Sequence, residues 1–307
     1  RRLYRGVRAV LMKSLVSFLM PFLLIMEAKA MDQATEYQFG VRWALNGLSS
    51  GVEVHDILLS FSGSPRHVDS MLPLSHYIRT GRNSVQLSAW PVPFEENHEL
   101  LLSLMYWEPG DNPNTEANTA FEVVMRPGLD NPAPELTFID ENAPLRALAD
   151  EVRWIDHESY FTLDVPFINR QPMPTWCWEQ GDVLQDNAAT RDSLTHEYRR
   201  LYELFEARDN DALMEASSTM IQELARASGE PEEYVRHRAS FNMFFNSPDV
   251  FQLNDFPEDP MTLNLGADNR VAWLTREGVA VPIRFEHVGN EERISNVRLY
   301  FIHHNGQ

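Results

Sequence analysis

The sequence predicts two folded parts of different class, an all-β domain at residues 31–165 followed by an α+β domain at residues 176–307. Three observations support this prediction. The first part contains runs in which apolar and polar side chains alternate, whereas residues 186–245 carry apolar side chains spaced three and four apart. Between the two parts lies a segment with three prolines, which we interpret as a linker at residues 166–175.

Composition narrows the classes of function. The 307 residues include 45 acidic and 26 basic side chains, which gives a formal charge of −19. Nucleic-acid binding needs basic groups that neutralise phosphates, so no nucleic-acid partner is predicted. A single cysteine excludes an internal disulfide framework and a multi-cysteine zinc site. Hydrolase, zinc-protease and nucleotide-binding fingerprints are missing, so no cofactor is predicted.

The first thirty residues have the pattern of a signal peptide. A basic stretch precedes the apolar run Ser14–Met26, which Pro21 interrupts, and an Ala-Lys-Ala cleavage pattern ends at Ala30. The apolar run is shorter than the ~20 residues of a membrane-spanning helix, although an uncleaved anchor remains the alternative. Met12 is the expected start, with residues 1–11 upstream of it. We therefore expect a bacterial-type protein that is periplasmic or secreted, with no membrane span after cleavage.

The charge is distributed unevenly between this segment and the rest. Residues 1–30 hold six basic side chains and one acidic side chain, so the remaining chain carries −24 from 44 acidic residues and 20 arginines. No lysine occurs after Lys29. An acidic surface without lysine is typical of adaptation to salt or of recognition of a basic partner, and both interpretations remain open.

Strand signals dominate the first domain. Ser84–Trp90 and Phe161–Val165 alternate apolar and polar residues, and Leu100–Trp107 is apolar on both faces, as in a central strand. Further candidates are Val52–Phe61 and Ala120–Met125. Turns rich in Gly, Pro and Asn separate these runs at nearly regular spacing. Many short strands without helices between them predict an antiparallel β-sandwich.

The second domain begins with three predicted helices. Asp186 is a suitable N-cap for the first helix, which runs to about Ala207. Asp209 opens a second helix that Gly229 ends, and Pro231 opens a third that reaches Phe244 or Phe245. Strand patterns follow at Met261–Leu265, Arg270–Arg276, Val279–His287 and Glu292–His303. Helices followed by an antiparallel meander predict an α+β domain.

The run Tyr198–Leu213, with its acidic break and an Asp-x-x-Ala-Leu pattern, resembles the opening of the nuclear-transport-factor-two-like superfamily, which includes ketosteroid isomerases and SnoaL-type cyclases. The resemblance covers residues 187–307. It implies three helices packed on a strongly curved antiparallel sheet, which together form a cone around an apolar pocket. The chain stops before the Trp-containing last strand usual in that superfamily, so we expect a domain truncated at its C-terminus. Around Tyr77–Leu87, the first domain is faintly similar to a galactose-binding-type jelly roll.

The resemblance also points to candidate pocket residues. In catalytic members a carboxylate base and a phenol or acid donor act on a small apolar substrate. The nearest catalytic candidates here are Asp255, Tyr300 and His303, and the candidate ligand contacts are Trp273, Arg284 and Phe301. In the alternative interpretation, Tyr300 and Trp273 pack in the core and Asp255 is a loop residue. No metal site is predicted, because adjacent strand residues such as His303 and His304 point to opposite faces.

Six of the seven tryptophans precede residue 179. Trp90, at a strand end, is a candidate glycan contact, although tryptophans in a β-sandwich are mainly core residues. Cys177 lies between Trp176 and Trp178 and is expected to be a buried, inert thiol rather than a nucleophile.

These patterns predict a non-catalytic, exported binding or interaction protein whose partner is a small apolar ligand or an envelope protein. Two alternatives remain: an isomerase- or hydrolase-type enzyme that uses the pocket of the cone, and glycan binding by the β-sandwich. The identity of the ligand and the oligomeric state are left open by the sequence.

Overall fold

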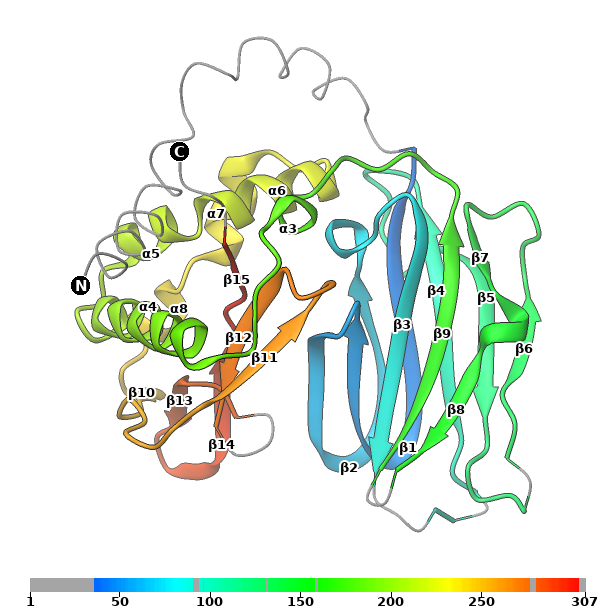
Figure 1. Cartoon of the computed structure of the whole chain (residues 1–307), viewed down its shortest axis with the longest axis horizontal. Helices are drawn as coiled ribbons and strands as arrows, with labels where there is room; N and C mark the ends of the chain where they lie inside the picture. The colour runs from blue at the N-terminus through cyan, green and yellow to red at the C-terminus, as the bar shows by residue number, and fades with distance from the viewer. Residues whose placement is uncertain are drawn as a thin grey trace. The chain divides into compact units, whose positions relative to one another are not determined.

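Figure 1 shows a computed structural model of the chain. The structure describes residues 36–303 except 91–93, 96, 131, 158–159 and 277–279. The predicted signal peptide, the predicted start at Met12, the turn at residues 277–278, His304 and the C-terminal end therefore lie outside the described residues. The predicted predominance of β-structure is confirmed, with 40% strand and 24% helix. No described helix combines the length and the apolar character that crossing a membrane requires.

The described residues divide into two compact units. The first unit comprises residues 36–176 and 227–229, and the second comprises residues 177–226 and 230–303. Each unit has an apolar core of its own.

One antiparallel sheet of nine strands forms the first unit. Along the sheet the order is β6-β5-β4-β1-β3-β9-β7, with β2 paired to β1 and β8 paired to β9. The strands are β1 (Gln38–Val54), β2 (Ile57–Pro73), β3 (Gly81–Trp90), β4 (Leu100–Trp107), β5 (Asn118–Met125), β6 (Glu135–Phe138), β7 (Leu145–Ala147), β8 (Arg153–Asp156) and β9 (Phe161–Asn169). Two short 3-10 helices, η1 (Ser75–Tyr77) and η2 (Ala149–Glu151), complete the unit.

Strand β1 is where the sheet turns. Its first half, Gln38–Leu45, pairs with β4, and its second half, Ser49–Val54, pairs with β3. Between the halves, Gly47 adopts the left-handed region at φ 71°, and the pairing of β1 with β2 shifts register. A glycine is favoured here because the left-handed region costs other residues energy. The sheet therefore separates into two arms, β4-β5-β6 and β3-β9-β7.

The two arms curl until they meet across the core. Phe121 of β5 and Phe167 of β9 have no exposed surface, and their ring centroids lie 6.3 Å apart. Three strands separate β5 from β9 along the sheet, so this ring contact requires strong curvature. The large antiparallel sheet is consequently close to a barrel (Figure 1).

Two sequence predictions for this unit are wrong in detail. Val52–Phe61 is not one strand, because His55 and Asp56, at φ 52° and 62°, form a two-residue hairpin turn between β1 and β2. That pair lacks the Asn or Gly that usually marks such a turn. The predicted linker at residues 166–175 also starts too early, since β9 continues to Asn169. Pro166 is tolerated there because it lies opposite the gap between β8 and β7, where no ladder partner needs its missing N–H.

The short helix η1 contains a titratable group that makes stability depend on pH. Burial lowers the pKa of His76 from its ordinary value of 6.5 to about 3. Between these two pKa values the unfolded chain binds a proton at His76 and the folded unit does not. The contribution of neutral His76 to the free energy of unfolding is therefore fully present above pH 6.5 and is lost as the pH falls toward 3. The upper limit for this loss of unfolding free energy is about 1.4 kcal/mol per pH unit. We expect a smaller loss, because the His76 ring is only half-buried and solvent screens its charge. Urea unfolding of His76→Gln between pH 7 and 4 should show a flatter pH dependence than the wild type, and identical slopes would contradict this prediction.

In the second unit six helices come first along the described chain, and six short strands follow them. The helices are α3 (Cys177–Gln180), α4 (Ala188–Glu206), α5 (Asn210–Ala216), α6 (Ser218–Ser228), α7 (Glu232–Ala239) and α8 (Asn242–Phe245). The strands are β10 (Phe251–Leu253), β11 (Thr262–Gly266), β12 (Val271–Thr275), β13 (Ile283–His287), β14 (Asn290–Val297) and β15 (Phe301–Ile302).

The three predicted helices correspond to five helices, α4 to α8. Asn187 rather than Asp186 caps α4, because its side chain accepts the N–H of Thr190 at 2.9 Å. The second predicted helix breaks at Ser217 between α5 and α6, and the third breaks at Ser240 between α7 and α8. Serine competes for backbone hydrogen bonds and favours helix ends over helix interiors.

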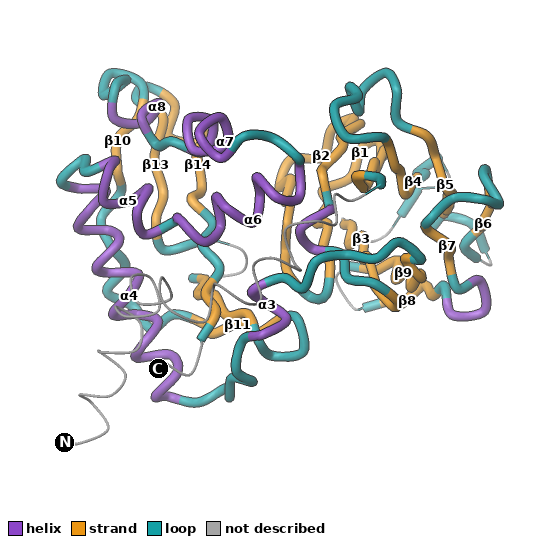
Figure 2. Tube along the Cα trace, turned by 90° about the horizontal axis from the view of Figure 1, so that it is seen from above, coloured by secondary structure: helices purple, strands orange, loops and turns teal. Residues whose placement is uncertain are grey.

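The strands of this unit form two antiparallel sheets, β10-β13-β14 and β11-β12-β15, rather than one continuous sheet. In Figure 2, β10, β13 and β14 lie side by side, apart from β11. The apolar face of α4, with Tyr198 and Phe205 buried, packs in one cluster with residues of both sheets, including Leu274 of β12 and Phe285 of β13. The Tyr198 hydroxyl donates to the carbonyl of Leu299 at 2.8 Å, which ties α4 to the segment between β14 and β15.

Candidate functional site

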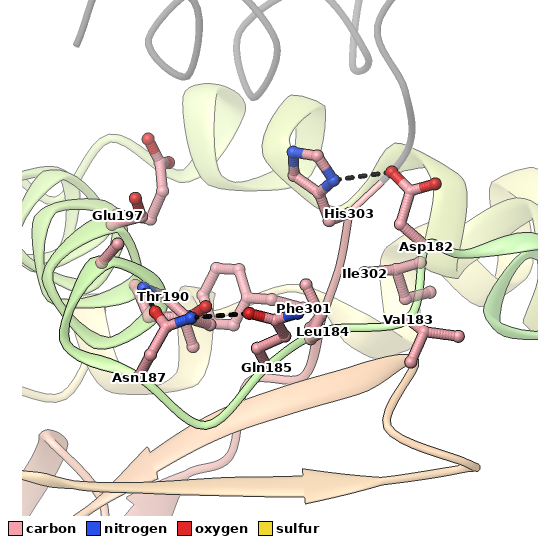
Figure 3. Close-up of a pocket in the computed structure, with 13 residues that line it drawn as sticks. Asp182, Val183, Leu184, Gln185, Asn187, Thr190, Glu197, Phe301, Ile302 and His303 are labelled. Carbon is pink, nitrogen blue, oxygen red and sulfur yellow. Dashed lines mark hydrogen bonds and ion pairs between the residues drawn. The ribbon is translucent and has the colours of Figure 1, made fainter. Parts of the chain in front are cut away.

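A cavity of about 360 Å³ opens in the second unit beside the start of α4 (Figure 3). Three segments line it: the loop before α4, the first turns of α4, and β15 with His303. The apolar lining residues are Val183, Leu184, Ala189, Leu194, Phe301 and Ile302. The polar lining residues are Asp182, Gln185, Asn187, Thr190, Ser193, Glu197 and His303.

Backbone hydrogen bonds hold the loop that forms one wall. Asp182 N–H donates to the carbonyl of His303 at 2.7 Å, and Leu184 N–H donates to the carbonyl of Asn269, also at 2.7 Å. The Arg270 guanidinium donates to the carbonyl of Gly181. The wall is thus tied to β15 on one side and to the β11–β12 turn on the other, so its shape is set before any ligand binds.

The β11–β12 turn is strained. Ala267, Asp268 and Asn269 all adopt left-handed backbone angles, at φ 51°, 57° and 62°. Such angles are unfavourable for residues with a Cβ, and they persist where the surrounding structure enforces them, often next to functional sites. Because Asn269 supplies the carbonyl that holds Leu184, the strained turn positions the cavity wall.

A paired imidazole and carboxylate lie at one side of the opening. His303 Nδ1 is 2.7 Å from Asp182 Oδ2 (Figure 3). Figure 3 shows Glu197 on the opposite side, with Phe301 between the two sides. Glu197 is only 8% exposed, and its carboxylate accepts from Arg200 Nε at 2.8 Å. The site therefore combines an apolar floor with hydrogen-bonding groups at its margins.

An imidazole oriented by a carboxylate can accept or donate a proton through its other nitrogen. Nucleophilic catalysis would also require a hydroxyl or thiol within hydrogen-bonding reach of that imidazole. Two hydroxyls, from Thr190 and Ser193, line the cavity. Within the described ranges, neither of them hydrogen-bonds to His303.

The structure separates the predicted pocket residues. His303 and Phe301 line this cavity, whereas Asp255 lines a second cavity farther along α4. Trp273 and Tyr300 pack edge to face at 5.4 Å. Arg284 lies half-buried on β13. The cause is that the predicted strand Glu292–His303 is interrupted at residues 298–300, and β14 and β15 belong to different sheets.

Sequence reasoning missed Asp182 and Glu197. Asp182 meets His303 across 121 positions of the chain, and no local spacing marks such a pair. Glu197 lies inside the predicted first helix, next to the buried face that carries Leu194 and Tyr198. An acidic residue beside an apolar helix face was the one available signal.

Cys177 has a hydrogen-bonding partner on α6. Its Sγ donates to Glu223 Oε2 at 2.8 Å. Burial, together with the Glu223 carboxylate, raises the pKa of the thiol well above its usual range, and burial also raises the pKa of Glu223. Since the thiolate is the nucleophile, this cysteine fits the interpretation of an inert thiol.

Trp90 is half-buried, and its ring stacks on Phe61 with centroids 5.4 Å apart. All seven tryptophans are among the described residues, and none belongs to the exposed large apolar side chains. The described part of the chain also contains no group of three side chains arranged to bind a metal ion.

No family model matches this chain, and no curated protein or solved structure matches it significantly. Its function must therefore be inferred from its own residues.

Proposed function

We propose that this protein is a non-catalytic binding protein that takes a small, largely apolar ligand in the cavity beside His303. The observation that carries the proposal is the lining, whose surface is mainly apolar, with contributions from Leu184, Leu194, Phe301 and Ile302, although seven of its thirteen residues are polar. Ligand sites in proteins commonly have this composition. The volume, about 360 Å³, is also within the range of about 300–1,000 Å³ for such sites.

Preorganisation of the wall supports the same proposal. Binding is weakened when a loop must be ordered, because the lost conformational entropy opposes association. Here the backbone of Asp182 and Leu184 is already hydrogen-bonded to His303 and Asn269. The ligand would therefore meet a wall whose backbone is already ordered.

The alternative is an isomerase- or hydrolase-type enzyme at the same cavity. It is favoured by the short contact between His303 and Asp182, which orients the imidazole. This alternative predicts that a bound compound is recovered chemically altered, whereas the binding protein releases it unchanged. Glycan binding by the first unit is less well supported, because one face of Trp90 is stacked on Phe61.

Two further parts of the proposal concern the fold class and the cellular location. We propose that the two arms of the nine-stranded sheet are the layers of a sandwich, which the contact between Phe121 and Phe167 supports. In the second unit, α4 packs against residues of both small sheets, as expected of a cone of the nuclear-transport-factor-two-like kind. Export to the periplasm, and the option of an envelope protein or another basic partner, rest on the leader pattern and the acidic composition.

Ala189→Trp tests the cavity directly. Ala189 is exposed and lines the cavity, so an indole there should fill the opening and weaken binding of the neutral fluorescent probe N-phenyl-1-naphthylamine by about tenfold or more. The measurement is a fluorescence titration of the full chain.

The matched control is Ala188→Trp, because Ala188 is also exposed at the start of α4 but does not line the cavity. This variant should bind the probe like the wild type. Equal affinities of the two variants, or no binding of the probe to the wild type, would count against a ligand site here. Thermal melting of both variants checks that α4 is intact.

A further inference from the structure

A second cavity, of about 310 Å³, lies where α4 ends. Its aromatic lining comes from α4, α8, β10 and β13, and includes Phe205, Phe244, Phe251 and Phe285. These rings pack on one another; Phe244, for example, stacks on Phe285 with centroids 4.3 Å apart. One wall of the cavity is therefore aromatic, with Phe244 and Phe251 half-buried in front of the buried Phe205 and Phe285. The cavity shares no lining residue with the cavity beside His303.

Arg208 lines this cavity from a position that does not favour arginine. It follows the C-cap Ala207 of α4 at φ 56°, where Arg208 N–H donates to the Phe205 carbonyl and Asp209 N–H donates to the Leu204 carbonyl. In this helix-ending motif the left-handed residue is usually glycine. Among the described residues, no hydrogen bond or ion pair engages the Arg208 guanidinium. The chain thus places an unpaired cation at a strained position beside an aromatic cavity.

Two carboxylates line the same cavity. Both Glu206 and Asp255 are exposed. Their negative charges, added to burial, raise the pKa of the Tyr202 hydroxyl, which places both carboxylates near that hydroxyl. No ion pair in the described part of the chain joins either carboxylate to Arg208. Charges of both signs are therefore presented to the cavity without neutralising each other.

We propose that this second cavity binds a free α-amino acid with a large apolar side chain. The carboxylate of such a ligand pairs with Arg208, its ammonium group lies between Glu206 and Asp255, and its side chain packs on the phenylalanine wall. A simple cation could pair with the two carboxylates but would leave Arg208 without a partner, and a simple anion would pair with Arg208 but lie close to the two carboxylates. A zwitterion on an apolar body satisfies all three charges, because a guanidinium binds a carboxylate through paired hydrogen bonds and an aromatic wall favours a cation as well as an apolar group.

The test compares L-phenylalanine with 2-phenylethylamine, which lacks the carboxylate, and 3-phenylpropanoate, which lacks the ammonium group. Isothermal titration calorimetry on the full chain should show L-phenylalanine binding at least about tenfold more tightly than either analogue. Arg208→Gly should weaken that binding about tenfold or more, while its melting temperature stays equal to or above that of the wild type, since glycine relieves the left-handed strain.

Arg146→Ala is the control, because it removes the same charge from an exposed position in the first unit and should leave binding unchanged. The proposal is overturned if L-phenylalanine does not bind the wild type, if Arg208→Gly binds it with wild-type affinity, or if 2-phenylethylamine binds as tightly as L-phenylalanine. These outcomes are independent of the cavity beside His303, where Ala189→Trp should leave L-phenylalanine binding intact.

Discussion

Phe121→Ala is expected to lower the free energy of unfolding of the first unit by about 3–5 kcal/mol. Phe121 has no exposed surface, so alanine leaves a cavity that the neighbouring strands cannot fill without moving. Urea unfolding followed by tryptophan fluorescence measures this loss, because five of the seven tryptophans lie in the first unit. Val124→Ala, on the other face of the same strand at a half-buried position, should cost much less.

The double variant with Phe167→Ala tests whether the arms of the sheet meet. Aromatic rings in contact usually have a coupling energy of about 0.5–1.5 kcal/mol. The sum of the two single losses in unfolding free energy should therefore exceed the loss in the double variant by about that amount. If the effects instead add to within about 0.3–0.5 kcal/mol, the two rings are not in contact and the sheet is more open than its geometry indicates.

Much of the first unit could be predicted because strand formation is patterned locally. The alternation in Ser84–Trp90 and Phe161–Val165 and the continuous apolar run Leu100–Trp107 lie within β3, β9 and β4. The pairing of β1 with β4 over its first half and with β3 over its second half could not be predicted. That depends on the bend near Gly47, and the neighbours of β1 are brought to it from positions far along the chain.

In the second unit, too, local patterns predict the helices but not the contacts between distant segments. The buried face of α4, with Leu194, Tyr198, Leu201 and Phe205, follows directly from helical spacing. The candidate site does not, because it requires a break in a strand that reads as continuous. With residues 298–300 outside the sheet, His303 pairs with Asp182 at one cavity, and Asp255 lines another. Hydrogen bonds between distant segments decided that outcome, and no pattern within the strand reports them.

Gly181→Ala is expected to disrupt the cavity beside His303 through a single added carbon. A Cβ at Gly181 would lie 2.5 Å from Ile302 Cγ2 and 3.2 Å from the carbonyl oxygen of Arg270. Isoleucine is branched at Cβ, so its Cγ2 moves only if the χ1 angle changes or the backbone of β15 shifts. Either movement displaces the wall loop from the carbonyl of His303. The expected cost is about 1–3 kcal/mol in unfolding free energy, the usual range for overpacking, and a loss of N-phenyl-1-naphthylamine binding of about tenfold.

The second substitution Ile302→Ala separates a steric effect from a general loss of folding. It removes the carbon that the new Cβ would meet, so Gly181→Ala with Ile302→Ala should bind the probe more tightly than Gly181→Ala alone. Rescue would follow only from restored space, because each alanine by itself weakens the unit. If Gly181→Ala binds the probe like the wild type, the close approach of residues 181 and 302 does not shape the cavity. A ligand at this site would then depend on the Asp182–His303 pair and the α4 face alone.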